Sequence, residues 1–441
     1  MKNFFLLNLC ISGIKNIEKM IEIPFYKKTI KDDFNPEQYR VKGIYGENGS
    51  GKTAIMTAVK IMTRILLDRN YLSDSVNQKL LAENINKKTK AAFIEAVFHA
   101  DFGIGEFTYR YRVHLETRPD GRVYLAGESL EKKNGRYSQN HYLPVFITQD
   151  GDLIQFDEGE KYEFCKAKTL NLLEQRSFAT FTDEIKAAGY EYGDDIWHHL
   201  FTLMIFAARI NVGIDGDDDH HQYASSIVQQ ETGNAVLHEM ETSALFSWSI
   251  PAGRDKGEIM ILQKMMPVFM EKVNKLVSFV RIFKPDLKNI KVDVKEYREF
   301  YICRLIMMYD GYELDQEYES RGIKKLMNLF DALDAACRGD IVFIDELDSN
   351  INDVYLDKLI EYFIYYGKGQ LCFTAHNLSP MSVLKNSKCA ISFISGVNTI
   401  HTWTSNGNLN PENAYRNGFI EDSPFNVEAS DFLGILGGAD E

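Results

Sequence analysis

Residues 46–53 read GENGSGKT, and this stretch decides the fold. It matches the pattern G-x-x-x-x-G-K-[ST] at every fixed position. The apolar run at 40–45 predicts a strand before it, and apolar residues at helical spacing in 53–68 predict a helix after it. A glycine-rich turn between a strand and a helix is typical of a loop that binds phosphate through its backbone N–H groups.

The residue types of this loop suit a triphosphate with its magnesium ion. Lys52 is expected to reach the β- and γ-phosphates, and the Thr53 hydroxyl is expected to ligate Mg²⁺. We therefore predict ATP and Mg²⁺ as cofactors. The residues predicted to bind ATP in this loop are Gly46, Asn48, Gly49, Ser50, Gly51, Lys52 and Thr53.

A second set of candidate residues follows two apolar runs in the last third of the chain. Residues 341–344 predict a buried strand, and Asp345 and Glu346 come directly after it. Asp345 is predicted to hold Mg²⁺, and Glu346 to act as the general base on the attacking water. His376 follows the apolar run at 371–374, where it is expected to hydrogen-bond the γ-phosphate or orient that water. The alternative, a buried strand that ends in a solvated acidic turn, is disfavoured by the phosphate loop upstream.

The rest of the chain predicts an α/β fold with an antiparallel region. Residues 92–157 alternate between polar and apolar with turn signals between the runs, which indicates an antiparallel β lobe. Residues 160–287 are predicted to be mostly helical. Within them, 258–283 carry an apolar stripe that Pro267 is expected to kink or divide. Strands return at 288–315.

Lys52 and Asp345 stand 293 positions apart (345 − 52), which leaves room for a large insertion between the two halves of the site. With its motifs GENGSGKT, VFIDELD and FTAHN, the sequence resembles the ABC-type ATPase heads of the SMC and RecF group. More closely, it resembles the AAA-15/AAA-21 ATPases of bacterial anti-phage systems such as Septu and PARIS. The resemblance implies a P-loop NTPase fold, with an ABC-ATPase head formed by 1–75, 288–441 and the β lobe. Residues 160–287 are then a helical insertion that contacts a second copy or a partner.

The same resemblance implies a signature loop that opens a helix before the acidic strand. Residues 319–326 occupy that place. Ser320, Gly322 and Lys324 are expected to contact the γ-phosphate of a nucleotide held by a second subunit. Two intervening positions depart from the family pattern, and a plain N-cap serine followed by a glycine is the alternative interpretation. A shared nucleotide implies a homodimer or a larger homo-oligomer.

A glutamine that senses Mg²⁺ is also implied, and the sequence leaves two candidates open. Gln149 and Gln175 both stand near the end of the predicted β lobe. Residues 215–221 read DGDDDHH, which has the composition of a metal site. Ligands adjacent in sequence rarely close a coordination sphere, so a solvated acidic loop is expected there.

Composition and charge exclude several classes of protein. Lys and Arg number 50 against 63 Asp and Glu, a net charge of −13, so a protein coated in basic residues for nucleic acid is excluded, although a local basic groove is not. Six cysteines without a CxxC pair predict reduced thiols in a cytoplasmic protein. No run approaches the roughly 20 apolar residues that span a bilayer, so no membrane contact is expected.

Three functions compete at this point. The first is a slow ATPase that acts as sensor or scaffold in an anti-phage complex and controls a separate effector nuclease through pairing of heads. The second is a DNA-repair or recombination ATPase stimulated by DNA, which the acidic charge disfavours. The third is a transporter nucleotide-binding subunit, which the long insertion and the missing LSGGQ sequence disfavour. We favour the first, which the resemblance implies; the chain carries no HNH, Toprim-like or Ser/His/Asp hydrolase motif, so the nuclease is expected to be a separate protein.

Pairing of heads predicts that ATP changes the size of the assembly. Ser320→Arg places a bulky side chain where the predicted helix N-terminus meets the γ-phosphate, so the variant should stay unpaired when ATP is added. Light scattering after size-exclusion chromatography, with and without ATP, measures the difference from the wild type. A particle size that ignores both ATP and the substitution contradicts the shared nucleotide.

Overall fold

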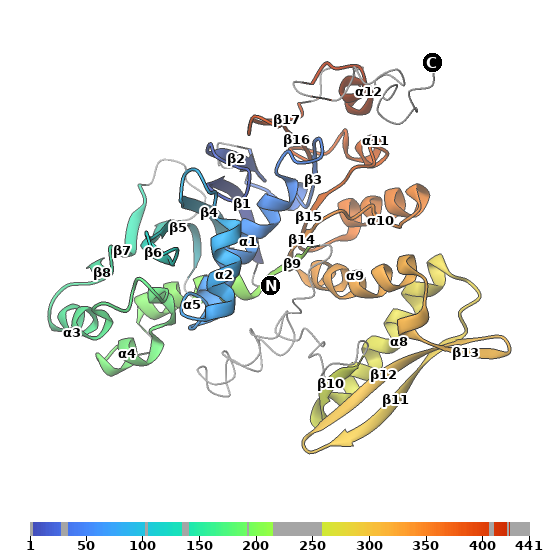
Figure 1. Ribbon diagram of the computed structural model, residues 1–441, viewed down its shortest axis with the longest axis horizontal. Helices are drawn as coiled ribbons and strands as arrows, with labels where there is room; N and C mark the ends of the chain where they lie inside the picture. The colour runs from blue at the N-terminus through green and yellow to red at the C-terminus, as the bar shows by residue number, and fades with distance from the viewer. Residues whose placement is uncertain are drawn as a thin grey trace, which may run out of the picture.

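The computed structural model shows a mixed α/β protein, which confirms the predicted class (Figure 1). It describes residues 3–27, 34–101, 105–134, 141–191, 194–214, 258–404, 410–420 and 423. The strands of these residues form three sheets: one mostly parallel and two antiparallel. The acidic stretch predicted at 215–221 lies outside the described residues.

The mostly parallel sheet lies in the middle of the molecule. Its order is β17 (Ile400–Thr402), β16 (Ile391–Ile394), β3 (Val41–Tyr45), β15 (Gln370–Thr374), β14 (Ile341–Ile344) and β9 (Ile210–Gly213). Only the β16–β17 pair is antiparallel among these neighbours. The strands predicted at 341–344 and 371–374 are confirmed, and they are buried throughout because both faces of the sheet are covered.

Alternate residues of the parallel strands face two separate cores, as the two-residue period of a strand requires. Ile44 and Phe343 face a core shared with helix α1 (Lys52–Leu67) and with the large antiparallel sheet. Tyr45 and Val342 face the other core. That core also holds α8 (Met266–Phe283), α9 (Arg321–Arg338), α10 (Asp353–Tyr366), α11 (Pro380–Leu384) and α12 (Pro411–Arg416).

The predicted antiparallel β lobe is confirmed, and it extends further than expected. Its strands are β4 (Ala91–Asp101), β5 (Glu106–Thr117), β6 (Val123–Asn134), β7 (Leu143–Gln149) and β8 (Asp152–Gln155). Two N-terminal strands, β1 (Asn3–Ser12) and β2 (Ile21–Pro24), add to the β4 edge and give the order β2-β1-β4-β5-β6-β7-β8. The short helix α2 (Ser75–Asn84) packs on β6.

The stretch 160–287, predicted as a helical insertion, divides among three parts of the fold. Helices α3 (Glu160–Thr169), α4 (Thr182–Ala187) and α5 (Asp195–Ala208) pack beside the β lobe and α1, whereas β9 joins the parallel sheet. Residues 258–283 are not one helix, because Ile259–Leu262 form β10 and Pro267 stands in the first turn of α8, where its missing N–H costs nothing. The remaining elements are β11 (Asn289–Tyr297), β12 (Phe300–Tyr309), β13 (Tyr312–Asp315) and the 3₁₀ turns Pro36–Gln38, Phe178–Thr180, Gln263–Met265 and Gln316–Tyr318.

The cysteines are free thiols, as the sequence predicts. Burial raises the pKa of the Cys165 and Cys303 thiols to about 11 and that of Cys372 to about 12. These thiols therefore stay protonated near neutral pH and are poor nucleophiles. Within the described ranges, no helix combines the length and apolar character needed to cross a membrane.

The turn after β1 depends on Gly13, whose φ is +72° and whose Cβ, if added, would lie 1.8 Å from the Ala91 carbonyl oxygen. Gly311 offers a matched control, because its φ is +86° but nothing lies within 4 Å of an added Cβ. We expect Gly13→Ala to lower the free energy of unfolding by at least about 3 kcal/mol and Gly311→Ala by about 1 kcal/mol. Urea denaturation measures both, and equal losses would show that the clash with Ala91 is relieved.

Candidate functional site

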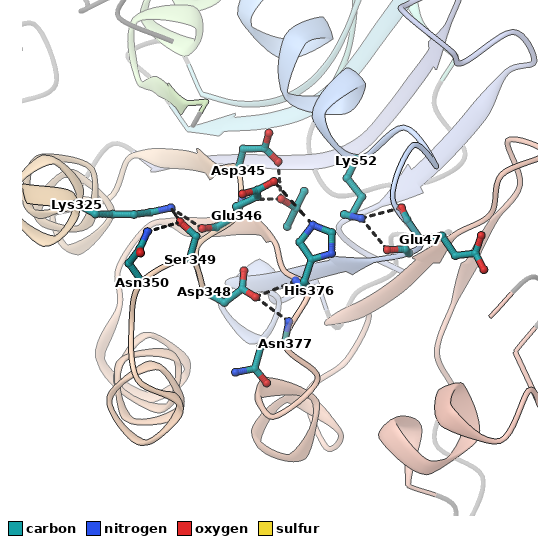
Figure 2. Close-up of polar contacts among 12 residues, drawn as sticks. Glu47, Lys52, Lys325, Asp345, Glu346, Asp348, Ser349, Asn350, His376 and Asn377 are labelled. Atoms are coloured by element: carbon teal, nitrogen blue, oxygen red, sulfur yellow. Dashed lines mark hydrogen bonds and ion pairs between the residues drawn. The ribbon is translucent and has the colours of Figure 1, made fainter. Parts of the chain in front are cut away.

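The loops singled out in the sequence meet at one edge of the parallel sheet. Thr374 of β15 lies opposite Ile44 of β3, and β14 ends at Ile344, one position earlier in the same register. Because the strands are parallel, the loops after them leave the sheet on the same side. Lys52 and His376 face the acidic pair at this edge (Figure 2).

The backbone of the 46–53 loop requires glycine at three positions. Gly49 and Gly51 have φ values of +79° and +113°, in the left-handed region that side chains disfavour. At Gly46 the reason is space, since a Cβ would lie 2.4 Å from the Ile394 carbonyl oxygen. Gly51 is also the N-cap of α1 and supplies no side chain to its first turn, so backbone N–H groups there are available to an anion.

The Lys52 ammonium folds back over this loop. Lys52 is 6% exposed, and its Nζ donates hydrogen bonds to the carbonyl oxygens of Gly46 (2.7 Å) and Glu47 (2.9 Å). Burial lowers the Lys52 pKa, and the nearby carboxylates, with Asp345 the strongest, act in the opposite direction. A phosphate would offer this ammonium charged acceptors in place of neutral carbonyls, and such hydrogen bonds are stronger.

The other predicted loop residues differ in exposure. Ser50 is 1% exposed, and its hydroxyl oxygen has no hydrogen-bond partner within the described part of the chain, an arrangement that a bound ligand would complete. Thr53 is half-buried in the first turn of α1, and Asn48 is exposed. Asn16, which the sequence analysis missed, donates from its side-chain amide to the Gly49 carbonyl oxygen.

The acidic pair differs in environment although its members are adjacent. Asp345 is 4% exposed, and its Oδ1 accepts a hydrogen bond from the Thr374 hydroxyl (2.5 Å). The Glu346 side chain is 40% exposed, and its Oε1 lies 3.8 Å from Nε2 of His376. A buried carboxylate held in place suits a metal ligand, and a more exposed one beside an imidazole suits proton transfer.

The loop that carries His376 is fixed by a third acid. Oδ2 of Asp348 accepts hydrogen bonds from the backbone N–H groups of His376 (2.9 Å) and Asn377 (2.7 Å). The sequence analysis did not assign this role to Asp348, although it forms part of the VFIDELD motif. The sequence does show a third carboxylate two positions after Glu346, one that the predicted reaction does not use.

The residues of the predicted signature loop lie at the start of α9, as expected for a loop that opens a helix. Ser320 is the N-cap of α9, and its hydroxyl oxygen accepts from the Ile323 N–H (3.3 Å), as the alternative interpretation describes. Lys324 Nζ donates to the Glu317 carbonyl oxygen (3.0 Å). Gly322 lies against the loop after the acidic pair, since a Cβ there would come within 3.1 Å of the Asn350 carbonyl oxygen. A role of these residues toward a second subunit's nucleotide stays a prediction.

Neither candidate glutamine follows a strand of the parallel sheet. Successive cross-strand partners lead from Ser12 of β1 through β4, β5 and β6 to Gln149 of β7. Gln149 is therefore four strand spacings, or about 19 Å, from Ser12. Gln175 lies between α3 and α4, next to Glu174, whose carboxylate pairs with Arg118 of the lobe. The strand that does end beside the acidic pair is β9, where the Gly213 carbonyl oxygen accepts from the Asp345 N–H (2.8 Å). The order of elements along the chain gave no indication of this neighbour.

No protein-family model matches the chain, and no curated protein matches it either. The function therefore has to be argued from the site itself. Among the described residues, no group of three or more His, Cys, Asp or Glu side chains is arranged to hold a metal ion. Mg²⁺ does not require such a cage, because it commonly binds to one or two protein ligands together with substrate phosphates. Thr53 and Asp345 fit that donor set.

Proposed function

We propose that the chain is an ABC-type ATPase with a P-loop NTPase fold that binds ATP with Mg²⁺ and hydrolyses it slowly. One observation carries the proposal. The register of β3, β15 and β14 brings a buried lysine on a glycine-rich loop to the same sheet edge as two adjacent carboxylates, with a histidine from the strand between them. Phosphoryl transfer depends mostly on positioning and on charge stabilisation, and these groups supply both.

Each residue has a distinct part in the proposed reaction. Lys52 and the loop N–H groups bind the phosphates, while Thr53 and Asp345 hold Mg²⁺, which neutralises charge on the phosphates. Glu346 accepts a proton from the attacking water, since its carboxylate is partly exposed. His376, within 3.8 Å of that carboxylate, orients the water or donates to the γ-phosphate.

We extend the proposal to pairs of heads, with Ser320, Gly322 and Lys324 of a second copy contacting the nucleotide. On the resemblance noted in the sequence, such pairs act as the sensor or scaffold of an anti-phage complex with a separate effector nuclease. A DNA-stimulated repair ATPase is the alternative. Arginines of the β lobe count against it, because Arg110 and Arg112 are paired with carboxylates at 2.6 Å and are not left for phosphates. Stimulation of turnover by DNA would favour the alternative.

Lys52→Ala tests the binding site. Removal of the ammonium takes away charge-assisted contacts to two phosphates, so we expect ATP affinity to fall by at least roughly 100-fold. Titration calorimetry measures the affinity. Lys358→Ala is the control, because Lys358 is exposed on α10 and pairs with Glu361 of the same helix, away from the 46–53 loop. Unchanged affinity in Lys52→Ala contradicts the site assignment.

Glu346→Gln tests the proposed base. The amide keeps the size of the side chain but cannot accept the proton, so ATP binding should persist while turnover falls by about 100-fold or more. Phosphate release and nucleotide affinity, measured on the same preparation, separate the two effects. Turnover at the wild-type rate removes Glu346 from the mechanism.

A further inference from the structure

The backbone at Glu346 adopts a conformation that is unfavourable for a residue with a side chain. Its φ is +49°, in the left-handed region. For a residue with a long side chain this conformation costs on the order of 1 kcal/mol or more, and it persists only where surrounding contacts impose it. Return to an ordinary helical φ near −60° would rotate the backbone by roughly 110° and redirect the carboxylate. The direction of this carboxylate therefore depends on whatever holds the peptide.

On the N-terminal side, the peptide is held by Thr374 at the end of β15. The Thr374 hydroxyl oxygen accepts the Glu346 N–H (2.8 Å), and the same hydroxyl donates to Oδ1 of Asp345 (2.5 Å). Thr374 is fully buried, so water does not replace either bond. The Thr374 hydroxyl thus accepts from the Glu346 backbone through an oxygen lone pair and donates its proton to the Asp345 carboxylate. Valine has no hydroxyl and can form neither hydrogen bond.

On the C-terminal side, the peptide is held by Lys325 from the first half of α9. The Lys325 ammonium donates to the Glu346 carbonyl oxygen (2.7 Å) and to the Ser349 hydroxyl (Figure 2). Both acceptors belong to the segment that follows β14, so the ammonium ties α9 to that segment. Lys325 thereby fixes the segment that carries the proposed base from outside the parallel sheet.

We infer that Lys325 and Thr374 are positioning residues that clamp the Glu346 peptide from its two sides. This inference rests on the proposed function, because the role of Glu346 as the base in that function gives the clamp its catalytic purpose. The two residues differ in one respect. Thr374 also donates to the carboxylate of Asp345, the proposed metal ligand, whereas the Lys325 bonds that carry this inference go to the Glu346 carbonyl oxygen and the Ser349 hydroxyl. The loss of each should therefore leave a different signature.

The test compares Lys325→Met and Thr374→Val with Lys325→Arg and Thr374→Ser, which retain the donor and the hydroxyl. We expect Lys325→Met to lower kcat by about 10- to 100-fold with ATP affinity within about twofold of wild type. Thr374→Val should lower kcat similarly and also raise the Mg²⁺ concentration for half-maximal rate. The conservative variants should recover most of the rate. Lys358→Met is the matched control for loss of a lysine.

A double variant separates positioning from general damage. Glu346→Gln removes the base that the clamp positions. The double variant Glu346→Gln, Lys325→Met should therefore have the same kcat as Glu346→Gln alone. Full additivity of the two losses overturns the positioning role. So does a Lys325→Met enzyme with the wild-type kcat.

Amide hydrogen exchange reports on the clamp without any catalysis. We expect the segment around Glu346 to exchange at least about fivefold faster in Lys325→Met and Thr374→Val, with no change at residues 41–55. Unchanged exchange at Glu346 overturns the clamp. A wild-type protein without ATP turnover overturns the proposed function and the catalytic purpose of the clamp, while the exchange result still decides whether the clamp exists. The two failures are thereby distinguished.

Discussion

The parallel hydrogen-bonded register of β3, β15 and β14 is the constraint on which the rest of the molecule depends. It fixes which residues end each strand and so which loops share an edge. A slip of one residue would send every side chain of a strand to the opposite face, and both faces are packed against apolar cores. The geometry of the site is therefore secured by burial elsewhere and does not depend on attraction between its own charged groups.

The charged groups of the site act on one another as well as on their surroundings. Burial disfavours the charged form of Lys52, and the carboxylates across the edge favour it, so the lysine is held between opposing effects. Its ammonium meanwhile uses backbone carbonyls as acceptors. The carboxylates of Asp345 and Asp348 are held in turn by neutral donors, the Thr374 hydroxyl and the backbone N–H groups of residues 376 and 377. Such preorganised donors are effective in catalysis because they need little rearrangement during the reaction.

The sequence predicts features that are encoded in a short stretch of residues, and it misses those that depend on contacts between residues far apart in the chain. The phosphate loop is contiguous, so its glycines, Lys52 and the flanking strand and helix were predictable from local pattern. The buried strands before Asp345 and His376 were also predictable, because four or five apolar residues in a row are distinctive. The roles of Thr374 and Lys325 were not predictable from the sequence. Each role depends on hydrogen bonds to residues that are distant in the chain and that only the fold brings close. The place of β9 beside β14 was missed for the same reason.

The central position of β3 has a consequence for how the protein is made. Both of its neighbours come from the far end of the chain, as Val41 pairs with Leu371, 330 positions later (371 − 41), and Gly43 with Ile391. During synthesis this strand emerges with both edges unpaired, and its partners are made only after more than 300 further residues. A chain that stops before these residues therefore has an incomplete central sheet, and the loops that follow β3, β14 and β15 cannot meet at one edge.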